Sequence, residues 1–295
     1  MKSYLHRLTG RWRYLTSLPS FRQSPIRTLW RTLSWRVHCW LSISATVTIP
    51  KWQARLSLNP EWKGAGVTLF YVVREDYEPE VHFLEKLISP GDVFVDAGAN
   101  CGVYTVAAAH FAGPSGKVLA FEPGEDSLAM LRRNVQLNRF NHVHVFPLAL
   151  SESSGTARLY SHNHGASSFT LGRTEEGDRL SFDIETATLD SVLARESITQ
   201  VDVIKMDVEG AEELILRGAT QLFDRCQPKV IFEINPPAIS RLNLSQQGAW
   251  DFLETRGYQF FIMQENGALV SLKTPPGAAN VIALHPRAHT LPSEL

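Results

Sequence analysis

Short apolar runs alternate with longer stretches of helical periodicity from about residue 61 onward. The runs are rich in Val, Ile and Phe, and they predict strands over residues 92–96, 117–121, 143–146, 201–206, 230–234, 259–263 and 281–284. Helices are predicted over residues 102–110 and 125–137, the second with apolar Leu128, Leu131 and Val135 at spacings of three and four. This alternation predicts an α/β fold: a mainly parallel sheet with helices on both faces, and a C-terminal antiparallel hairpin formed by the last two strands.

One segment does not fit the alternation. Residues 151–188 are rich in Ser, Thr, Gly and His, and the segment is too long for an ordinary connection of a few residues. It predicts extra edge strands or a loop over a ligand site. Together with residues 235–244, it is where we expect substrate specificity to lie.

Charge divides the chain unevenly. Residues 1–60 contain ten Lys or Arg and no Asp or Glu, while the remainder holds 19 basic and 30 acidic residues, a balance of −11. Five of the seven tryptophans lie in the same basic segment: Trp12, Trp30, Trp35, Trp40 and Trp52. We therefore predict an N-terminal extension over residues 1–60 and a second domain over 61–290. Contact with an anionic membrane surface and simple packing on the domain both remain open for the extension, whereas nucleic-acid binding is less favoured.

Cysteine usage and hydropathy limit the class of protein further. Cys39, Cys101 and Cys226 are widely spaced and form no CxxC pair, so neither a disulfide framework nor a zinc site is indicated. No stretch approaches the roughly 18 uninterrupted apolar residues of a membrane span. We expect a cytoplasmic protein, associated with a membrane at most peripherally.

The strongest local signal is the run Asp96-Ala-Gly-Ala-Asn-Cys-Gly102, where the first strand turns into its helix. Gly98 and Gly102 allow a ligand to approach the backbone closely, and the helix N-terminus offers free N–H donors. Asp96 would suit the positively charged amino group of a bound methionine moiety. The turn alone could also be a tight strand-to-helix connection.

A second signal is Glu122, at the end of the second strand and 20 positions after Gly102. An acidic side chain there can accept both ribose hydroxyls of an adenosine. A nicotinamide fingerprint expects GxGxxG, but here Asn100 stands where the second glycine would be. The turn therefore favours an adenosyl cofactor that carries no pyrophosphate.

A third signal follows the strand predicted over residues 201–206. It carries Lys205, Asp207 and Glu209 to the carboxyl edge of the sheet, where open α/β sheets bind their ligands. These three residues are the candidates for orienting a substrate or accepting its proton. Glu212 and Glu213 are better explained as first-turn carboxylates that face the helix dipole.

Together these motifs resemble the FkbM family of S-adenosylmethionine-dependent methyltransferases over about residues 75–265. The residues that carry the resemblance are DAGANCGVYT at 96–105, FEP at 121–123, TLD at 188–190, KMDVEGAE at 205–212 and FEI at 232–234. The resemblance implies a class I, Rossmann-like methyltransferase fold and O-methylation of a hydroxyl on a sugar, polyketide or other small molecule. It also implies roles by position: the methionine end of the cofactor at Asp96, Gly98, Asn100, Tyr104 and Thr105, its ribose at Glu122, and the reaction centre at Asp207 and Glu209.

An alcohol acceptor must lose a proton during methyl transfer. Our hypothesis is that Asp207 or Glu209 removes it, with His162 or His164 as a further candidate. The sequence is not sufficient to assign a Mg²⁺ site at Asp207, and we assign no metal. An NAD-dependent oxidoreductase and a catalytically silent, membrane-associated binding protein remain as alternative readings.

Overall fold

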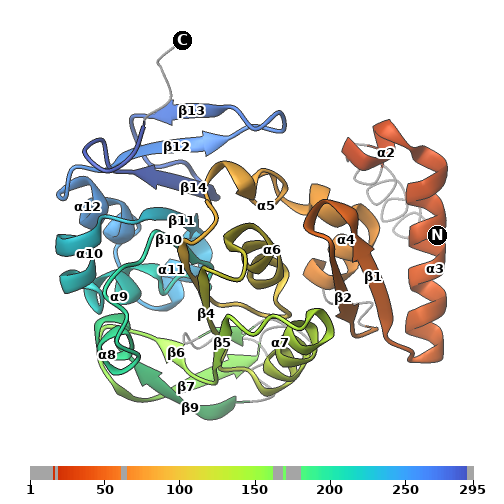
Figure 1. The fold of residues 1–295 in the computed structure, drawn as a ribbon, viewed down its shortest axis with the longest axis horizontal. Helices are drawn as coiled ribbons and strands as arrows, with labels where there is room; N and C mark the ends of the chain where they lie inside the picture. Colours follow the sequence, from red (N-terminus) through yellow and green to blue (C-terminus); the bar gives the residue numbers. More distant parts are fainter. Residues whose placement is uncertain (1–15, 17–18, 61–64, 162–168, 171–180, 291–295) are drawn as a thin grey trace.

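The computed structural model describes residues 16, 19–60, 65–161, 169–170 and 181–290, and its centre is an eight-stranded sheet (Figure 1). The strand order is β13-β12-β14-β11-β10-β3-β4-β5. Five neighbouring strands run parallel to one another: β11 (Lys229–Ile234), β10 (Val203–Met206), β3 (Val93–Ala97), β4 (Lys117–Phe121) and β5 (Val143–Phe146). The predicted α/β fold with a mainly parallel sheet is confirmed.

The predicted strand bounds are met at both ends for β4, β5 and β12 (Gln259–Met263). The prediction for β10 began too early, because Val201 and Asp202 precede the strand. The Asp202 carboxylate instead accepts a hydrogen bond from the backbone N–H of Val93, with an N···O distance of 2.8 Å. This contact ties together the amino ends of the two central strands.

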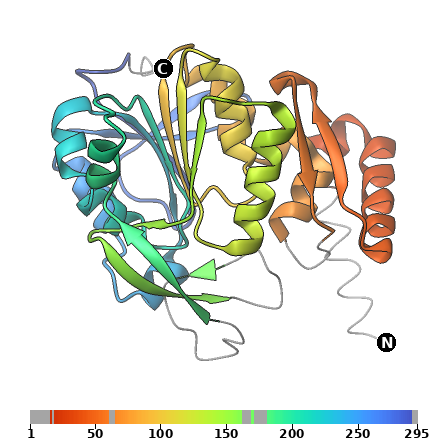
Figure 2. The same ribbon diagram turned by 60° about the horizontal axis from the view of Figure 1, so that its bottom comes forward.

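Alternation along the strands divides the core between the two faces of the sheet. Val95, Leu119 and Ile204 point to the side covered by α8 (Leu189–Arg195), α9 (Glu212–Arg217), α10 (Thr220–Cys226) and α12 (Gly248–Glu254). Phe94 and Val118 point to the side covered by α6 (Val103–Ala112) and α7 (Glu125–Asn138). Figure 2 shows the sheet between these two helical layers, as the predicted helices on both faces require.

A smaller sheet follows β5 and accounts for much of the Ser- and Thr-rich segment. Its order is β6-β9-β7-β8, with β6 (Ala149–Leu150), β7 (Gly155–Ser161), β8 (Phe169–Thr170) and β9 (Ser181–Ala187). The predicted extra strands therefore exist, but they form a sheet of their own and not an edge of the main sheet. His162 and His164 lie outside the described residues.

The C-terminal strands pair antiparallel, though not as a simple hairpin. β14 (Ala279–Leu284) lies between β11 and β12 and is antiparallel to both. An additional strand, β13 (Leu269–Leu272), connects them in sequence and forms the outer edge against β12. Its exposed Val270 and short length explain why the apolar pattern did not reveal it.

Residues 19–58 form a helix pair and a β-hairpin at one end of the molecule. They comprise α2 (Pro19–Gln23), α3 (Pro25–Leu41), β1 (Ala45–Ile49), η1 (Pro50–Trp52) and β2 (Ala54–Leu58). The hairpin packs against α6 and α7 in a shared core, and the buried Asn134 side chain bridges to both backbone groups of Ser57. The hairpin therefore covers the outer side of the α6–α7 layer.

The segment from α4 (Ala65–Val73) to the first strand of the main sheet consists of short helical turns: η2 (Arg74–Tyr77), α5 (Pro79–His82) and η3 (Leu84–Lys86). A further short helix, α11 (Pro236–Arg241), follows β11. Across the described parts of the chain, no helix combines the length and the apolar content that crossing a bilayer requires. Cys39, Cys101 and Cys226 are free thiols.

Candidate functional site

The turn between β3 and α6 is drawn against the turn that follows β10. Gly98 has φ 78°, and a Cβ added to it would lie 2.0 Å from the backbone oxygen of Asp207, so only glycine permits this approach. The Gly98 and Ala99 amides donate to the carbonyl of Phe121 at 3.1 and 3.0 Å. The carboxyl ends of β3, β4 and β10 thus meet at one point.

Glu122 lies at the end of β4 and organises the glycine turn. Its two carboxylate oxygens accept the backbone N–H groups of Asn100 and Gly124, each at 2.8 Å. Burial raises the pKa of Glu122 to about 7, although these two hydrogen bonds act in the opposite direction. A carboxylate oxygen can accept more than one hydrogen bond, so the predicted role toward a ribose is compatible with these contacts.

Asp96 and Thr105 lie beneath the turn, fully buried. The Thr105 hydroxyl donates to one Asp96 oxygen at 2.5 Å. The other oxygen has no hydrogen-bond partner and lies 4.0 Å from the ammonium nitrogen of Lys205. Burial raises the pKa of Asp96, and the charge of Lys205 opposes this shift. The predicted contact of Asp96 with the methionine end of a cofactor stays a prediction.

Lys205 is a buried cation held between acids. Its ammonium donates to Asp207 at 3.1 Å and lies 4.7 Å from the centre of the Tyr104 ring. Burial alone would lower the pKa of Lys205, but Asp207, Asp96 and Glu78 outweigh it and raise the pKa. Lys205 therefore stays protonated at neutral pH. A protonated ammonium can orient a substrate but has no lone pair with which to accept a proton, and the predicted role of Lys205 toward a substrate stays a prediction.

A second polar network joins α5, α6 and β14 beside this cation. The Tyr104 hydroxyl donates to Glu78 at 2.6 Å, and the Asn280 amide donates to the same oxygen of Glu78 at 3.2 Å and to Glu80 at 3.5 Å. Burial raises the pKa of Glu78, and it raises that of Glu80 to about 7. Sequence reasoning missed Glu78, Glu80 and Asn280. The alternating acids at 76, 78 and 80 were the available signal.

Asp207, Glu209 and Glu233 form the open part of the site. The Asp207 side chain is 42% exposed, and Glu209 adopts a left-handed backbone conformation with φ 55°. Burial, reinforced by the charges of Asp207 and Glu209, raises the pKa of Glu233 to about 7. The motif around Glu233 contributed to the family resemblance, but sequence reasoning did not include Glu233 in the site.

Glu212 and Glu213 form hydrogen bonds and an ion pair within the protein. Glu212 is buried and accepts the N–H groups of Val208 and Gly210 at 3.0 and 3.4 Å, so it supports the turn that carries Asp207 and Glu209. Burial raises its pKa to about 8. Glu213 pairs with Arg217 one turn later on α9. Both residues lie in the first turn of α9, and their contacts are structural, but they are made to the preceding turn and to Arg217; the predicted interaction with the helix dipole stays a prediction.

The structure thus brings all ten predicted site residues to the carboxyl edge of the central strands. They are Asp96, Gly98, Asn100, Gly102, Tyr104, Thr105, Glu122, Lys205, Asp207 and Glu209. Within the described residues, no group of three or more His, Cys, Asp or Glu side chains is arranged to hold a metal ion.

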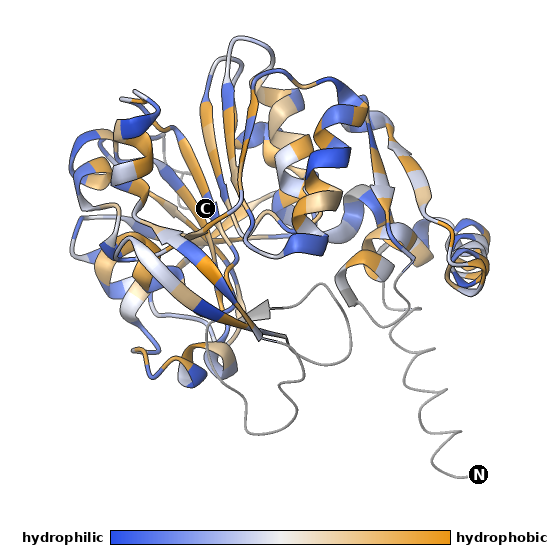
Figure 3. Cartoon of the chain, turned by 90° about the horizontal axis from the view of Figure 1, so that it is seen from below, coloured by the Kyte–Doolittle hydropathy of each residue, from blue (hydrophilic) through white to orange (hydrophobic). Residues whose placement is uncertain are grey.

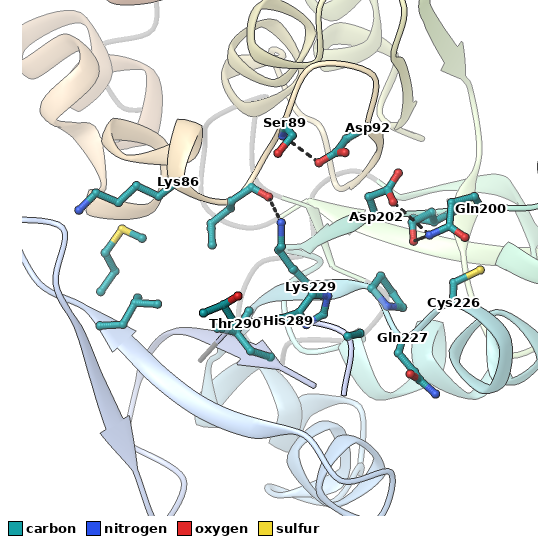
Figure 4. Close-up of a pocket in the computed structure, with 17 residues that line it drawn as sticks. Lys86, Ser89, Asp92, Gln200, Asp202, Cys226, Gln227, Lys229, His289 and Thr290 are labelled. Atoms are coloured by element: carbon teal, nitrogen blue, oxygen red, sulfur yellow. Dashed lines mark hydrogen bonds between the residues drawn. The ribbon is translucent and has the colours of Figure 1, made fainter. Parts of the chain in front are cut away.

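A separate cavity of about 490 Å³ lies at the opposite edge of the sheet. Asp92, Asp202 and Lys229 line it where β3, β10 and β11 begin, as Figure 4 shows. The Lys229 ammonium donates to the carbonyl of Leu87 at 2.7 Å. Because ligands of parallel sheets bind at the carboxyl ends of the strands, this cavity is not part of the candidate site.

A mainly parallel sheet with a glycine turn after β3, an acid after β4 and a charged cluster after β10 is the arrangement expected of a class I methyltransferase. The chain belongs to the methyltransferase FkbM domain family, whose model matches residues 96–260. The predicted family is thereby confirmed, and S-adenosylmethionine is the cofactor of this family.

Three curated proteins illustrate the range of relatives. The 31-O-demethyl-FK506 methyltransferase FkbM of Streptomyces tacrolimicus is 30% identical over 159 residues, 44% of this chain and 60% of that protein. Methyltransferase sdnD of Sordaria araneosa is 29% identical over 181 residues, 51% of this chain and 69% of that protein. The AMB antimetabolite synthetase AmbE of Pseudomonas aeruginosa is 26% identical over 234 residues, and the match spans only 11% of its length.

Similar solved structures are also methyltransferases. The FkbM methyltransferase of Methylobacillus flagellatus KT matches with a TM-score of 0.43 and 17% identity, over 76% of this chain and 55% of that one. The protein SMU.1697c of Streptococcus mutans, solved in complex with SAH, matches with a TM-score of 0.40 and 12% identity, over 68% of this chain and 93% of that one.

Proposed function

We propose that the chain is an O-methyltransferase. Its acceptor is a hydroxyl of a sugar, a polyketide or another small molecule, or of a glycan. The observation that carries the proposal is the side chain of Asp207, which is held by the buried Lys205 ammonium and yet 42% exposed at the carboxyl edge of the sheet. A carboxylate that is oriented by a buried ammonium group and is still accessible to a ligand is suited to accept a proton from an alcohol.

The residues around the opening fit S-adenosylmethionine by their charge. The charges of Glu78, Asp96 and Asp207 act on the buried cation Lys205, and repulsion from Asp207 and Glu209 contributes to the raised pKa of Glu233. A ligand that carries a sulfonium and an ammonium would relieve this repulsion and favour the ionised carboxylates. A pyrophosphate would meet the same acids unfavourably, which weighs against a nicotinamide cofactor.

When bound, the cofactor supplies a methyl group that is already activated by the positive sulfur. The protein's own part is to orient the acceptor, to exclude water and to take up the acceptor's proton. We assign the proton to a carboxylate oxygen of Asp207, with Glu209 beside it in the same turn. Lys205 and Glu212 act as positioning residues, Lys205 through the Asp207 side chain and Glu212 through the backbone of the turn.

The proposal is tested by transfer of a labelled methyl group to a defined set of acceptors. The set contains 31-O-demethyl-FK506, which a relative's name identifies as that protein's substrate, together with simple glycosides and polyketide alcohols. Each alcohol is paired with the analogue that carries an amine at the same carbon. We expect label only in alcohols, recovered as methyl ethers by mass spectrometry. Transfer restricted to the amines would overturn the assignment to oxygen.

Cofactor recognition gives a prediction that needs no acceptor. Calorimetric titration with S-adenosylhomocysteine is expected to show micromolar binding, and Glu122→Ala to weaken it by about 10- to 100-fold because a ribose diol loses its charged acceptor. NAD is expected not to bind. Because Glu122 also accepts the Asn100 and Gly124 amides, thermal unfolding of the variant is measured alongside. Unchanged affinity in a folded Glu122→Ala protein would contradict the ribose role.

A further inference from the structure

Helix α3 carries large apolar side chains on the side that faces away from the protein. Ile26, Trp30 and Trp40 are 84%, 70% and 83% exposed, and Leu29, Leu33 and Val37 are exposed as well. These six residues recur at spacings of three and four, which places them on one side of the helix. We call this surface the α3 outer face. Figure 3 shows α3 close to end-on at the rim of the molecule, beyond the β1–β2 hairpin.

The opposite side of α3 is fixed to the rest of the protein. Trp35 is fully buried, its indole N–H donates to Thr68 of α4 at 3.0 Å, and its ring stacks on Tyr71 with a centroid distance of 4.5 Å. Arg31 donates to the carbonyl of Val72 at 3.1 Å. Both sides of α3 therefore carry apolar side chains, but only the side with Trp35 packs against the rest of the protein. A continuous exposed apolar surface of this kind indicates an interaction site.

Charge around the α3 outer face selects the partner. Arg22, Arg27 and Arg36 are exposed on α2 and α3, and residues 1–60 contain no acidic residue. Two copies that met through this face would bring these cations together without a carboxylate from the same segment to neutralise them. An apolar stripe with tryptophan on it and arginine beside it is the arrangement of a helix that lies in a membrane interface, with the guanidinium groups at the lipid phosphates.

We infer that the α3 outer face binds the surface of an anionic lipid bilayer, with α3 lying in the plane of the interface. The helix has 17 residues and no acidic side chain. The packing of Trp35 on α4 holds the apolar side chains in place before any lipid is met, which reduces the ordering cost of binding. The inference concerns α2 and α3 alone and is independent of the proposed methyl transfer.

Co-sedimentation of the full chain with lipid vesicles tests the inference. We expect binding to vesicles of phosphatidylcholine mixed with phosphatidylserine, and weaker binding when the salt concentration is raised. The double variant Trp30→Ser, Trp40→Ser is expected to bind at least about tenfold more weakly, because two exposed rings no longer enter the interface. The matched control is Val270→Ser, which removes an exposed apolar side chain on β13 and is expected to bind as the wild type does.

The electrostatic part is tested separately. Arg27→Gln with Arg36→Gln is expected to weaken binding to the mixed vesicles, whereas Arg132→Gln, an exposed position on α7, is expected to have no effect. Absence of wild-type binding, or unchanged binding by the tryptophan variant, would overturn the inference. The inference would also be overturned if the wild type did not bind vesicles but formed a concentration-dependent dimer that the tryptophan variant lacked. The α3 outer face would then be an interface between two copies of the chain. S-adenosylhomocysteine affinity, expected to be unchanged in all variants, reports the proposed function independently.

Discussion

Replacing Asp207 by asparagine is expected to lower kcat for methyl transfer by about 10²- to 10⁴-fold, the contribution of a positioned proton acceptor. Asparagine keeps the size of the side chain and an oxygen that can accept the hydrogen bond from Lys205, which is 3.1 Å long in the wild type. It does not take up a proton at neutral pH. Affinity for S-adenosylhomocysteine, measured by calorimetry, is expected to change by no more than about threefold, which separates lost chemistry from lost binding.

Three further variants decide whether the effect is specific to Asp207. Asp251→Asn changes an exposed carboxylate on α12 and is expected to keep the wild-type rate. Glu209→Gln and Glu233→Gln test the two other carboxylates of the opening. If Asp207→Asn retains the wild-type rate while Glu209→Gln loses it, the proton acceptor is Glu209. If all three variants of the opening retain the rate, the acceptor lies elsewhere, and the assignment fails.

The part of the site that could be predicted from the sequence consists of short segments that directly follow a strand. The segment from Asp96 to Thr105 and the segment from Lys205 to Glu209 each follow a recognisable apolar strand. In a parallel sheet, the carboxyl ends of neighbouring strands meet, so residues adjacent in sequence to two strand ends must lie together. Glu122 followed from the same rule.

The other part of the site depends on contacts between distant segments. Asn280 donates to Glu78 across 202 positions of the chain, and nothing in the local sequence of either residue indicates the other. β14 runs antiparallel between β11 and β12, and this position of the strand is what carries Asn280 to the site. The order of β12, β13 and β14 was not predicted, because the hydropathy of a strand does not identify the strands with which it pairs.

The N-terminal hairpin was missed for a different reason. Ala45, Val47 and Ile49 alternate with exposed residues, which is the period-two signal of a strand. The segment is dominated by Trp and Arg, and the alternation within it spans only five residues, which makes it a weak signal. The exposed side of α3 likewise followed only from the packing of Trp35 on α4.

The second large effect is expected on stability, from the replacement of Lys205 by methionine. Asp96 is fully buried, and the oxygen that faces Lys205 has no hydrogen-bond partner, so the variant leaves a buried carboxylate without its cation. Removing one partner of a buried ion pair destabilises a protein by about 3–5 kcal/mol. Urea denaturation measures this loss, and Lys117→Met, a lysine at the start of β4, serves as the control with an expected change below about 1 kcal/mol.

The dependence on pH and the double variant distinguish lost charge compensation from lost packing. Burial already raises the pKa of Asp96, and Lys205 lowers it, so in Lys205→Met the folded-state pKa lies higher still. A carboxyl group whose pKa is raised on folding lowers the free energy of unfolding only slightly at low pH, where the folded and unfolded states both hold the proton. The loss grows as the pH rises above the unfolded-state pKa. The deficit should therefore be smaller at pH 5 than at pH 8, and the added substitution Asp96→Asn should recover most of it. A deficit that is equal at both pH values and survives Asp96→Asn would mean that Lys205 stabilises the fold through its packing on Tyr104, and not through its charge.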